Sequence, residues 1–386
     1  MTLLSTADGV WISDALIDAK TTTELKEYAA ILECVLERQK DWYPESPSRM
    51  LNLVDPSLFP LMYDRSWLCR PANTSSPAKF PGSFDKWREA LTNTEDEELG
   101  YYLPAPRFCW LPSEFCVDDN GAVTIESYIN NLRPVKHAAL YPIIVSVFSK
   151  FIPFLEQALT DLVRPREPRV VPELEEIPIE KHCGQLGYYY QSDESEPGPE
   201  CQVFPDYQTY LATSFKAPQP KPFVTPARSK IPYKLSNQRL QVIVKMSNIK
   251  LTPDRPANER IVAAGIFLYD VINIARSVLR FREAPSAQSF EGPFYEEDSI
   301  FAAYGVDREH FLFTQKVGEV DIKDGRCLVF PNTYEHEMSP LKLKNYSEPG
   351  HCNMLTFYIV NPSMRIPSTA IVPPAKRLVD RGCTVV

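Results

Sequence analysis

The sequence predicts an α+β fold, with a helical amino-terminal part and an antiparallel barrel or jelly roll in the carboxyl-terminal part. In the first 163 residues, apolar side chains recur at helical spacing in two segments. After residue 235, short β-branched segments follow one another with turn residues and no helical pattern between them. We therefore expect a helical and loop-rich region over 1–163, a connection over 164–232 and a barrel core over 233–386.

Two helices are expected in the first part. One begins near Thr21, because Thr21 and Glu24 have the spacing of a capping box. It carries an apolar stripe typical of a core-facing helix, formed by Leu25, Tyr28, Ala29, Leu32, Val35 and Leu36. The other lies in an apolar run that begins at Ala138 and approaches the length of a membrane span. Acidic residues follow this run directly, so a buried, proline-interrupted helix of a soluble protein is the better interpretation.

The connection over 164–232 is rich in proline and acidic residues and has almost no periodic apolar pattern. This composition is typical of a long surface segment, which serves as a linker or as an arm around the rest of the chain. A proline-rich docking ligand is the alternative interpretation of the same residues.

The last part contains several segments with the alternation or the β-branched composition of strands. One of them includes the turn Lys323-Asp-Gly-Arg326 and is expected to form a hairpin. The segments are 240–246, 260–269, 278–282, 317–330 and 354–360. A series of strands without intervening helices predicts the antiparallel barrel or jelly roll.

Composition excludes several classes of function. The formal charge is −9, so the chain lacks the basic surface that follows nucleic-acid phosphates. It contains no phosphate-binding loop, no dinucleotide-binding turn and no nucleophile elbow. The nine cysteines form no C-x-x-C pair, and the start of the chain lacks the basic segment of a signal peptide. We expect a cytoplasmic protein with neither a nucleic-acid nor a membrane partner.

The tail contains a recurring arrangement of a turn, a strand and a histidine. Asp324-Gly325 precedes an apolar strand that ends in Phe330-Pro331, and His336 follows. This resembles the second half of the double-stranded β-helix, a jelly roll, of iron/2-oxoglutarate oxygenases. The resemblance implies that the late histidine is a metal ligand and that a basic residue on the next strand binds the 2-oxoglutarate carboxylate.

The wider chain resembles a fungal family called domain of unknown function 4246, which has an oxygenase-like core. The matching stretches are 41–44, 55–59, 110–115, 127–132, 134–137, 240–253, 258–270 and 330–374. The resemblance implies that the barrel of this chain is a double-stranded β-helix on which the helical amino-terminal region packs.

The chain departs from the family in two places. A family segment with an H-x-E motif, which supplies a histidine and a carboxylate, is missing between Thr252 and Arg260. No histidine of the chain has an acid two positions later: His137, His182, His310, His336 and His351. The cosubstrate arginine is replaced by Cys352, whose neutral thiol cannot pair with a carboxylate as a guanidinium does. We therefore expect no metal site and no cofactor.

These observations predict a metal-independent, non-redox enzyme of fungal secondary metabolism that acts on an apolar terpenoid or polyketide intermediate. It would be a cyclase or isomerase, including a Diels–Alder pericyclase, because orientation of the reacting ends needs no metal. The candidate catalytic donors are His336, Tyr269, Lys245, Arg282 and Tyr334. The candidate substrate-binding residues are Phe267, Met246, Phe281, Cys352, Met354, Thr356 and Tyr358.

Two alternatives stay open. The first is a non-catalytic protein that binds a small molecule or serves as a scaffold. The second is an active iron/2-oxoglutarate oxygenase whose ligands are not recognisable as motifs, for example His336 with His351 or His310 and Glu259.

Overall fold

The structure is a computed structural model that describes part of the 386 residues. The described residues are 3–4, 9–37, 40–42, 51–63, 65–68, 78–79, 108–163, 232–248, 259–283, 307–309 and 312–374. The connection predicted over 164–232 lies outside them, apart from its last residue, as does the segment 249–258.

The chain divides into two compact units. One consists of Met1–Arg164, Ser229–Phe281 and Gly318–Val386, and the other of Pro165–Arg228 and Arg282–Val317. The described residues of the second unit form the end of strand β13, strand β14 and the first part of strand β15. The site described below is built from residues of the first unit.

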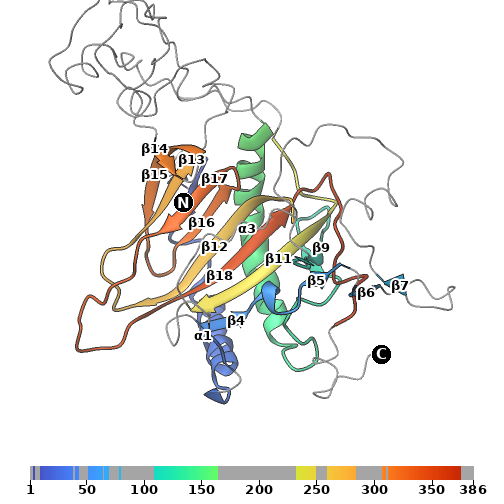
Figure 1. The fold of residues 1–386 in the computed structure, drawn as a ribbon, viewed down its shortest axis with the longest axis horizontal. Coiled ribbons are helices and arrows are strands. Elements are labelled where there is room, and N and C mark those ends of the chain that lie inside the picture. The colour runs from blue at the N-terminus through green and yellow to red at the C-terminus, as the bar shows by residue number, and fades with distance from the viewer. Residues whose placement is uncertain are drawn as a thin grey trace, which may run out of the picture. The chain divides into compact units, whose positions relative to one another are not determined.

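The described part of the chain is mostly β, with two long helices (Figure 1). A ten-stranded antiparallel sheet has the order β1-β2-β16-β12-β18-β11-β4-β3, and β9 and β10 join it beside β11. Its strands are β1 (Leu3–Leu4), β2 (Trp11–Ser13), β3 (Asp41–Trp42), β4 (Leu51–Val54), β9 (Ser113–Val117), β10 (Val123–Ile125), β11 (Gln238–Asn248), β12 (Ile261–Ile272), β16 (Cys327–Pro331) and β18 (His351–Val360).

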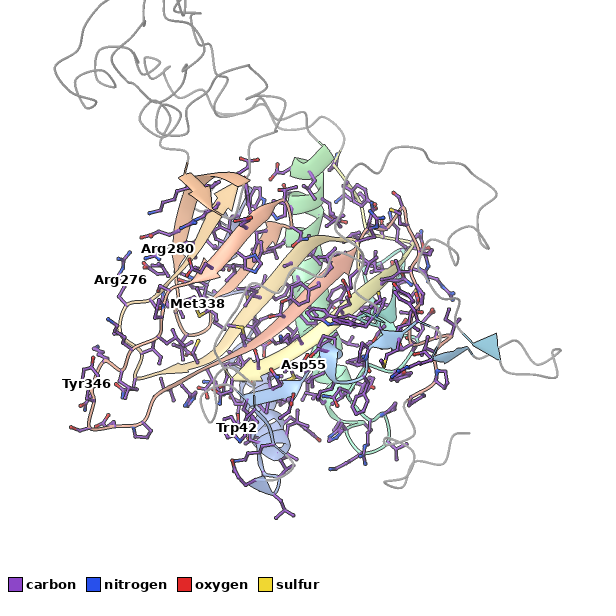
Figure 2. The ribbon with its side chains drawn as sticks, viewed as in Figure 1. Trp42, Asp55, Arg276, Arg280, Met338 and Tyr346 are labelled. Atoms are coloured by element: carbon purple, nitrogen blue, oxygen red, sulfur yellow. The ribbon has the colours of Figure 1, made fainter. Side chains whose placement is uncertain are left out.

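The smaller sheets complete the β structure. A four-stranded sheet has the order β14-β15-β13-β17, and two short pairs are β5 with β8 and β6 with β7. The bounds are β5 (Leu61–Met62), β6 (Trp67–Leu68), β7 (Ala78–Lys79), β8 (Phe108–Cys109), β13 (Val278–Glu283), β14 (Asp307–Glu309), β15 (Leu312–Asp321) and β17 (Tyr334–Met338). Arg280 of β13 and Arg276, which precedes this strand, pair with Glu319 of β15 (Figure 2).

Successive strands after β11 pass between the ten-stranded and the four-stranded sheet. The chain leaves β12 in the large sheet for β13 and β15, returns to β16, crosses to β17 and returns to β18. The rings of Phe281 on β13 and Phe330 on β16 meet edge to face at 5.0 Å, so the two sheets share a core there. This alternation between two antiparallel sheets is the pattern of a jelly roll.

The hairpin expected around Gly325 is wrong. The turn exists, and Gly325 adopts a positive φ of 74°, which favours glycine. However, β15 pairs in the small sheet whereas β16 pairs with β12 and β2 in the large one. The alternating pattern on both sides of the turn is satisfied by more distant strands, which local sequence does not reveal.

The expected start of the first helix also needs correction. Helix α1 (Ala19–Glu33) begins before Thr21, and its amino-terminal cap is Asp18, whose carboxylate accepts a hydrogen bond from the Thr21 N–H at 2.9 Å. Asp18 competes successfully because a carboxylate is as good a cap as a hydroxyl and also complements the helix dipole. Leu25 and Ala29 are buried as expected, but Leu36 lies beyond the helix and is exposed.

Helix α3 (Leu140–Val163) covers one face of the large sheet (Figure 1). Residues 140–162 are long and apolar enough to cross a membrane, but their apolar side chains lie in one core with the sheet and α1. Phe148 and Phe151 pack edge to face on Phe357 of β18. Gly265 of β12 lies so close that an added Cβ would be 2.7 Å from Cδ1 of Phe151. This supports the interpretation of a buried helix rather than a membrane span.

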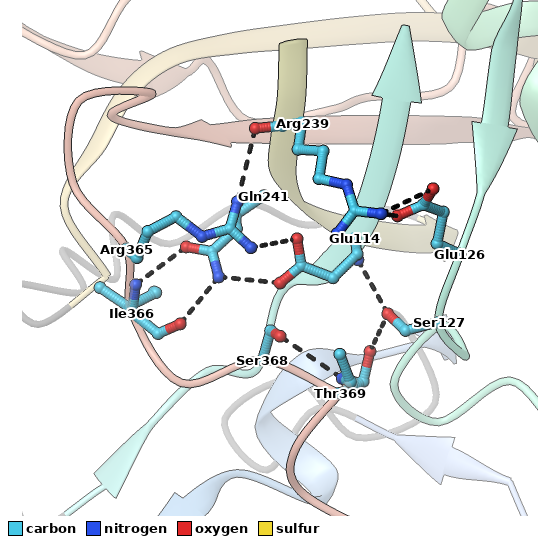
Figure 3. Close-up of polar contacts among 10 residues, drawn as sticks. Glu114, Glu126, Ser127, Arg239, Gln241, Arg365, Ile366, Ser368 and Thr369 are labelled. Atoms are coloured by element: carbon cyan, nitrogen blue, oxygen red, sulfur yellow. Dashed lines mark hydrogen bonds and ion pairs between the residues drawn. The ribbon is translucent and has the colours of Figure 1, made fainter. Parts of the chain in front are cut away.

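A second core covers part of the opposite face of the sheet. It contains Trp110, Ile243 of β11 and, from the segment 361–374 after β18, Ile366 and Val372. Figure 3 shows how this segment is attached: Arg365 forms an ion pair at 2.5 Å with the buried carboxylate of Glu114. The backbone of Ile366 exchanges two hydrogen bonds with the Gln241 amide, at 2.7 and 2.9 Å. The segment therefore forms a fixed cover over this end of the sheet.

Candidate functional site

The large sheet has two faces of different character. Gly265 touches Phe151, so it belongs to the helix-covered face, and its neighbours Ala264 and Ile266 belong to the opposite face. We call this opposite face, which looks toward the small sheet and the segment 361–374, the inner face. Side chains of directly opposed residues lie on the same face, so the register places further residues on it.

Three cross-strand rows make up the inner face. One row runs Lys245, Thr356, Ile266 and Leu328 across β11, β18, β12 and β16. The next contains Ile243, Tyr358, Ala264 and Phe330, and the third contains Ser247, Met354 and Leu268. Apolar side chains dominate these rows, and Lys245 is their only charged residue.

The inner face brings together five of the residues predicted for the site. Lys245 and Thr356 are direct cross-strand partners, and Cys352, Met354 and Tyr358 share their face by strand alternation. Thr356 is buried, whereas Lys245 is half-buried. The sequence predicted the common face of the four β18 residues, but the pairing of Lys245 with Thr356 depends on a register between distant strands.

The Lys245 amine has an aromatic neighbour rather than an acidic one. Its Nζ lies 5.7 Å from the ring centroid of Trp110, a cation–π distance, and the Tyr358 ring lies 6.1 Å from that of Trp110. Within the described ranges, no carboxylate lies close enough to Lys245 to form an ion pair. The three N–H donors of the amine are therefore available to a ligand on the inner face.

Three other predicted residues lie on the helix-covered face. Phe267, Tyr269 and Met246 are fully buried in the core with α1 and α3. Burial raises the pKa of Tyr269, and the nearby carboxylates of Glu33 and Asp270 raise it further. The sheet separates these three side chains from Lys245, so the structure does not bring the two groups together.

The remaining predicted residues lie in the small sheet. Phe281 contacts Phe330 and Tyr334, and the His336 ring packs on Phe330 at a centroid distance of 4.8 Å. Phe281 and Tyr334 are buried, and His336 is half-buried. Arg282, the residue after Phe281, is also half-buried and alternates to the other face of β13. His336 thus reaches the inner face through Phe330, on the same cross-strand row as Tyr358.

The residues of the described chain do not fit the iron site of an oxygenase. Non-haem iron needs two histidines and a carboxylate on one side, and no group of three histidine, cysteine or acidic side chains in the described residues could hold a metal. His351 binds Asp270 at 2.7 Å, and the Glu259 carboxylate accepts a hydrogen bond from the Trp110 N–H at 2.6 Å. Neither His351 nor Glu259 forms a three-ligand group with His336.

The position expected for the cosubstrate arginine is also unsuited to a carboxylate. Cys352 is 1 % exposed, and burial, followed by the charges of Asp324 and Asp270, raises the pKa of its thiol well above the usual range. The thiol is therefore neutral and offers only a weak donor. No step of a reaction is assigned to iron or 2-oxoglutarate in this chain.

A set of polar residues beside Lys245 carries no recognisable signal in the sequence. Asn52 of β4 pairs with Ser247, and its Nδ2 donates a hydrogen bond to Asp41 Oδ2 at 3.1 Å. Burial is the main cause that raises the pKa of Asp41. The charge of Asp55 raises this pKa further, and the charge of Lys245 lowers it. Asp55 caps the short helix η2 (Pro56–Leu58), which contacts β11. Asp41 and Asp55 each lie in a stretch typical of the family, but no pattern indicated that β4 pairs with β11.

The family comparison confirms the resemblance seen in the sequence. No curated protein matches the chain. Among solved structures, the chain is similar to one titled selenomethionine labeled Fe(II)/(alpha)ketoglutarate-dependent dioxygenase TqaL, with 11% identity, 90% of this chain and 91% of that chain covered, and a TM-score of 0.28. The family model described as protein of unknown function (DUF4246) matches residues 1–379, nearly the whole chain. The chain therefore belongs to this family.

Proposed function

We propose that the protein is a metal-independent, non-redox enzyme that binds an apolar terpenoid or polyketide intermediate on the inner face and promotes its cyclisation. A pericyclic reaction of the Diels–Alder type is the simplest form of this chemistry. It needs no nucleophile and no redox group, because holding the two reacting ends together lowers the barrier.

The observation that carries the proposal is the Lys245–Thr356 pair on an otherwise apolar face. Apolar side chains of the neighbouring rows, such as Ile266 and Met354, suit a hydrocarbon body. The Lys245 amine and the Thr356 hydroxyl suit one carbonyl oxygen of that body. Hydrogen-bond donors that are already in position polarise the carbonyl and stabilise the negative charge that develops on its oxygen as the reaction proceeds.

Other residues contribute position and shelter in this proposal. Trp110 is buried and holds the amine by a cation–π contact, which limits its orientations. The segment 361–374 packs on Ile243 of the inner face, and Phe281 of the small sheet packs on Phe330. His336 stands at the small-sheet side, where it would be a second donor to the substrate.

The test uses the intact protein in the presence of EDTA. It is incubated with the linear intermediate made by the biosynthetic genes beside its own gene, and products are separated by liquid chromatography with mass detection. The expected result is an isomer of unchanged mass that forms faster than without protein. Lys245→Met, which keeps an unbranched apolar side chain at this position, should lower the rate about 10-fold or more, since one transition-state donor is lost.

Lys150→Met, on the exposed side of α3, is the matched control and should retain the full rate. An oxidised product that depends on added Fe(II) would establish the oxygenase alternative instead. Binding of the intermediate without any acceleration would contradict the enzyme and establish a binding protein.

A further inference from the structure

Four polar groups lie next to one another on the inner face, across strands β4, β11 and β18. Lys245 opposes Thr356, Ser247 follows two positions later on the same face, and Asn52 opposes Ser247. Directly opposed side chains in a sheet are close neighbours, with Cβ atoms about 5 Å apart. We call these four residues the polar corner.

Three of the four residues of the polar corner are buried, and one of them carries an acceptor without a hydrogen-bond partner among the described residues. Asn52 is 8 % exposed, and its Oδ1 has no hydrogen-bond partner among the described residues. The hydroxyl-bearing residues Ser247 and Thr356 are 2 % and 3 % exposed. A buried polar group without a partner costs folding free energy, so such a cluster indicates a ligand or bound water.

The corner offers donors on one side and an acceptor on the other. Lys245 can only donate, while Thr356 can donate or accept. At the opposite end, Asn52 donates one of the two N–H groups of its Nδ2 to Asp41, and its Oδ1 is an acceptor without a partner among the described residues. A complementary group therefore carries a carbonyl oxygen beside an N–H or O–H.

The charges near the polar corner indicate that its ligand group is neutral. Asp41 lies near enough to both Asp55 and Lys245 to interact with their charges. These two acids against one amine leave an excess of negative charge, which disfavours a carboxylate ligand. A carboxamide has the required carbonyl and N–H in fixed positions without adding charge.

We propose that the polar corner recognises a carboxamide, so that the substrate is an apolar chain with an amide carbonyl on Lys245 and Thr356 and its N–H on Asn52. This inference rests on the proposed function, because it names the substrate class of the same inner face. The proposed amide site is separate from the position of the missing carboxylate anchor. That position is Cys352, which lies on the same strand four residues before Thr356.

The experiment compares four probes with the same C8 chain by isothermal titration calorimetry: octanamide, N,N-dimethyloctanamide, octanoate and octylamine. Octanamide should bind about 5-fold more tightly than the dimethyl amide, which lacks the N–H, since one buried hydrogen bond is lost. Asn52→Ala should remove this preference without affecting the dimethyl amide. Thr356→Val should weaken both amides, and Thr124→Val on the exposed side of β10 should change neither.

The outcomes separate the two proposals. If octanoate or the dimethyl amide binds as well as octanamide and Lys245→Met abolishes this binding, the amide inference is wrong and the proposed ligand face stands. If no probe binds the wild-type protein, both proposals fail. If Asn52→Ala does not fold, Ser247→Ala is used in its place. In either case the wild-type protein must bind octanamide more tightly than N,N-dimethyloctanamide.

Discussion

Removal of the Arg365 side chain tests whether the segment 361–374 is held by a buried charge. Glu114 has a side chain 7 % exposed, and its carboxylate is shared between Arg365 at 2.5 Å and the Gln241 amide at 3.1 Å. In Arg365→Met the carboxylate loses its cation but stays covered. Arg365 itself is 47 % exposed, so water would partly replace it.

The expected loss of unfolding free energy is therefore intermediate. Breaking a fully buried pair costs about 3–5 kcal/mol, and a hydrogen bond to a charged group contributes about 1.5–3 kcal/mol. With one partner half-exposed, we expect a loss of about 2 kcal/mol in urea denaturation followed by circular dichroism. The double variant Glu114→Gln/Arg365→Met should lose less than Arg365→Met alone, because no charge remains buried.

The chain contains a matched control in the same network (Figure 3). Arg239 pairs with Glu126 at 3.0 Å, but its side chain is 67 % exposed. Arg239→Met should therefore cost no more than about 0.5 kcal/mol. If Arg365→Met and Arg239→Met reduce stability equally, the buried pair does not hold the segment and the reasoning is refuted.

Three further predictions follow from close contacts and charges. Gly265→Ala should destabilise by about 1–3 kcal/mol by urea denaturation, and Phe151→Leu should relieve part of this in the double variant; additive losses would contradict the close contact. The hydrogen bond from Arg326 is the main cause that lowers the pKa of Asp14 to about 2, so Asp14→Asn should lose up to about 1 kcal/mol at pH 7. The difference from wild type should shrink as the pH falls from about 4 toward 2, and a pH-independent difference would refute it. Among the cysteines that the structure describes, Cys34 should react with iodoacetamide before Cys109, Cys327 and Cys352 in the native protein, as peptide mapping by mass spectrometry would show, whereas equal labelling would contradict the burial of the latter three.

The strand content of the last part could be predicted because its strands are long and follow simple patterns. β12 and β18 extend over regions where alternation and β-branched residues predicted strands. β4 could not be predicted in this way, since all four of its residues are buried and no alternation is visible. Its position beside β11 also depends on tertiary packing rather than on local preference.

The candidate site could be predicted only in part for the same reason. Alternation correctly grouped Thr356 with its neighbours on β18, but it could not tell which face of β12 they share. Phe267 and Tyr269 were therefore grouped with Lys245, although the helices cover them. Asn52 carried no signal in the sequence, because its role comes from its position opposite Ser247, at a register irregularity between β4 and β11.

The central position of β18 has a consequence for how the chain reaches its native state. β18 is the last strand of the described chain, yet it lies between β11 and β12, which both precede it by many residues. Until residue 360 has left the ribosome, β11 and β12 each expose an unpaired edge toward an empty position. Such pairings form slowly, and open edges invite association with other chains. Truncation before His351 should therefore produce an aggregating chain rather than a smaller folded domain, and the final step of folding should be the insertion of β18.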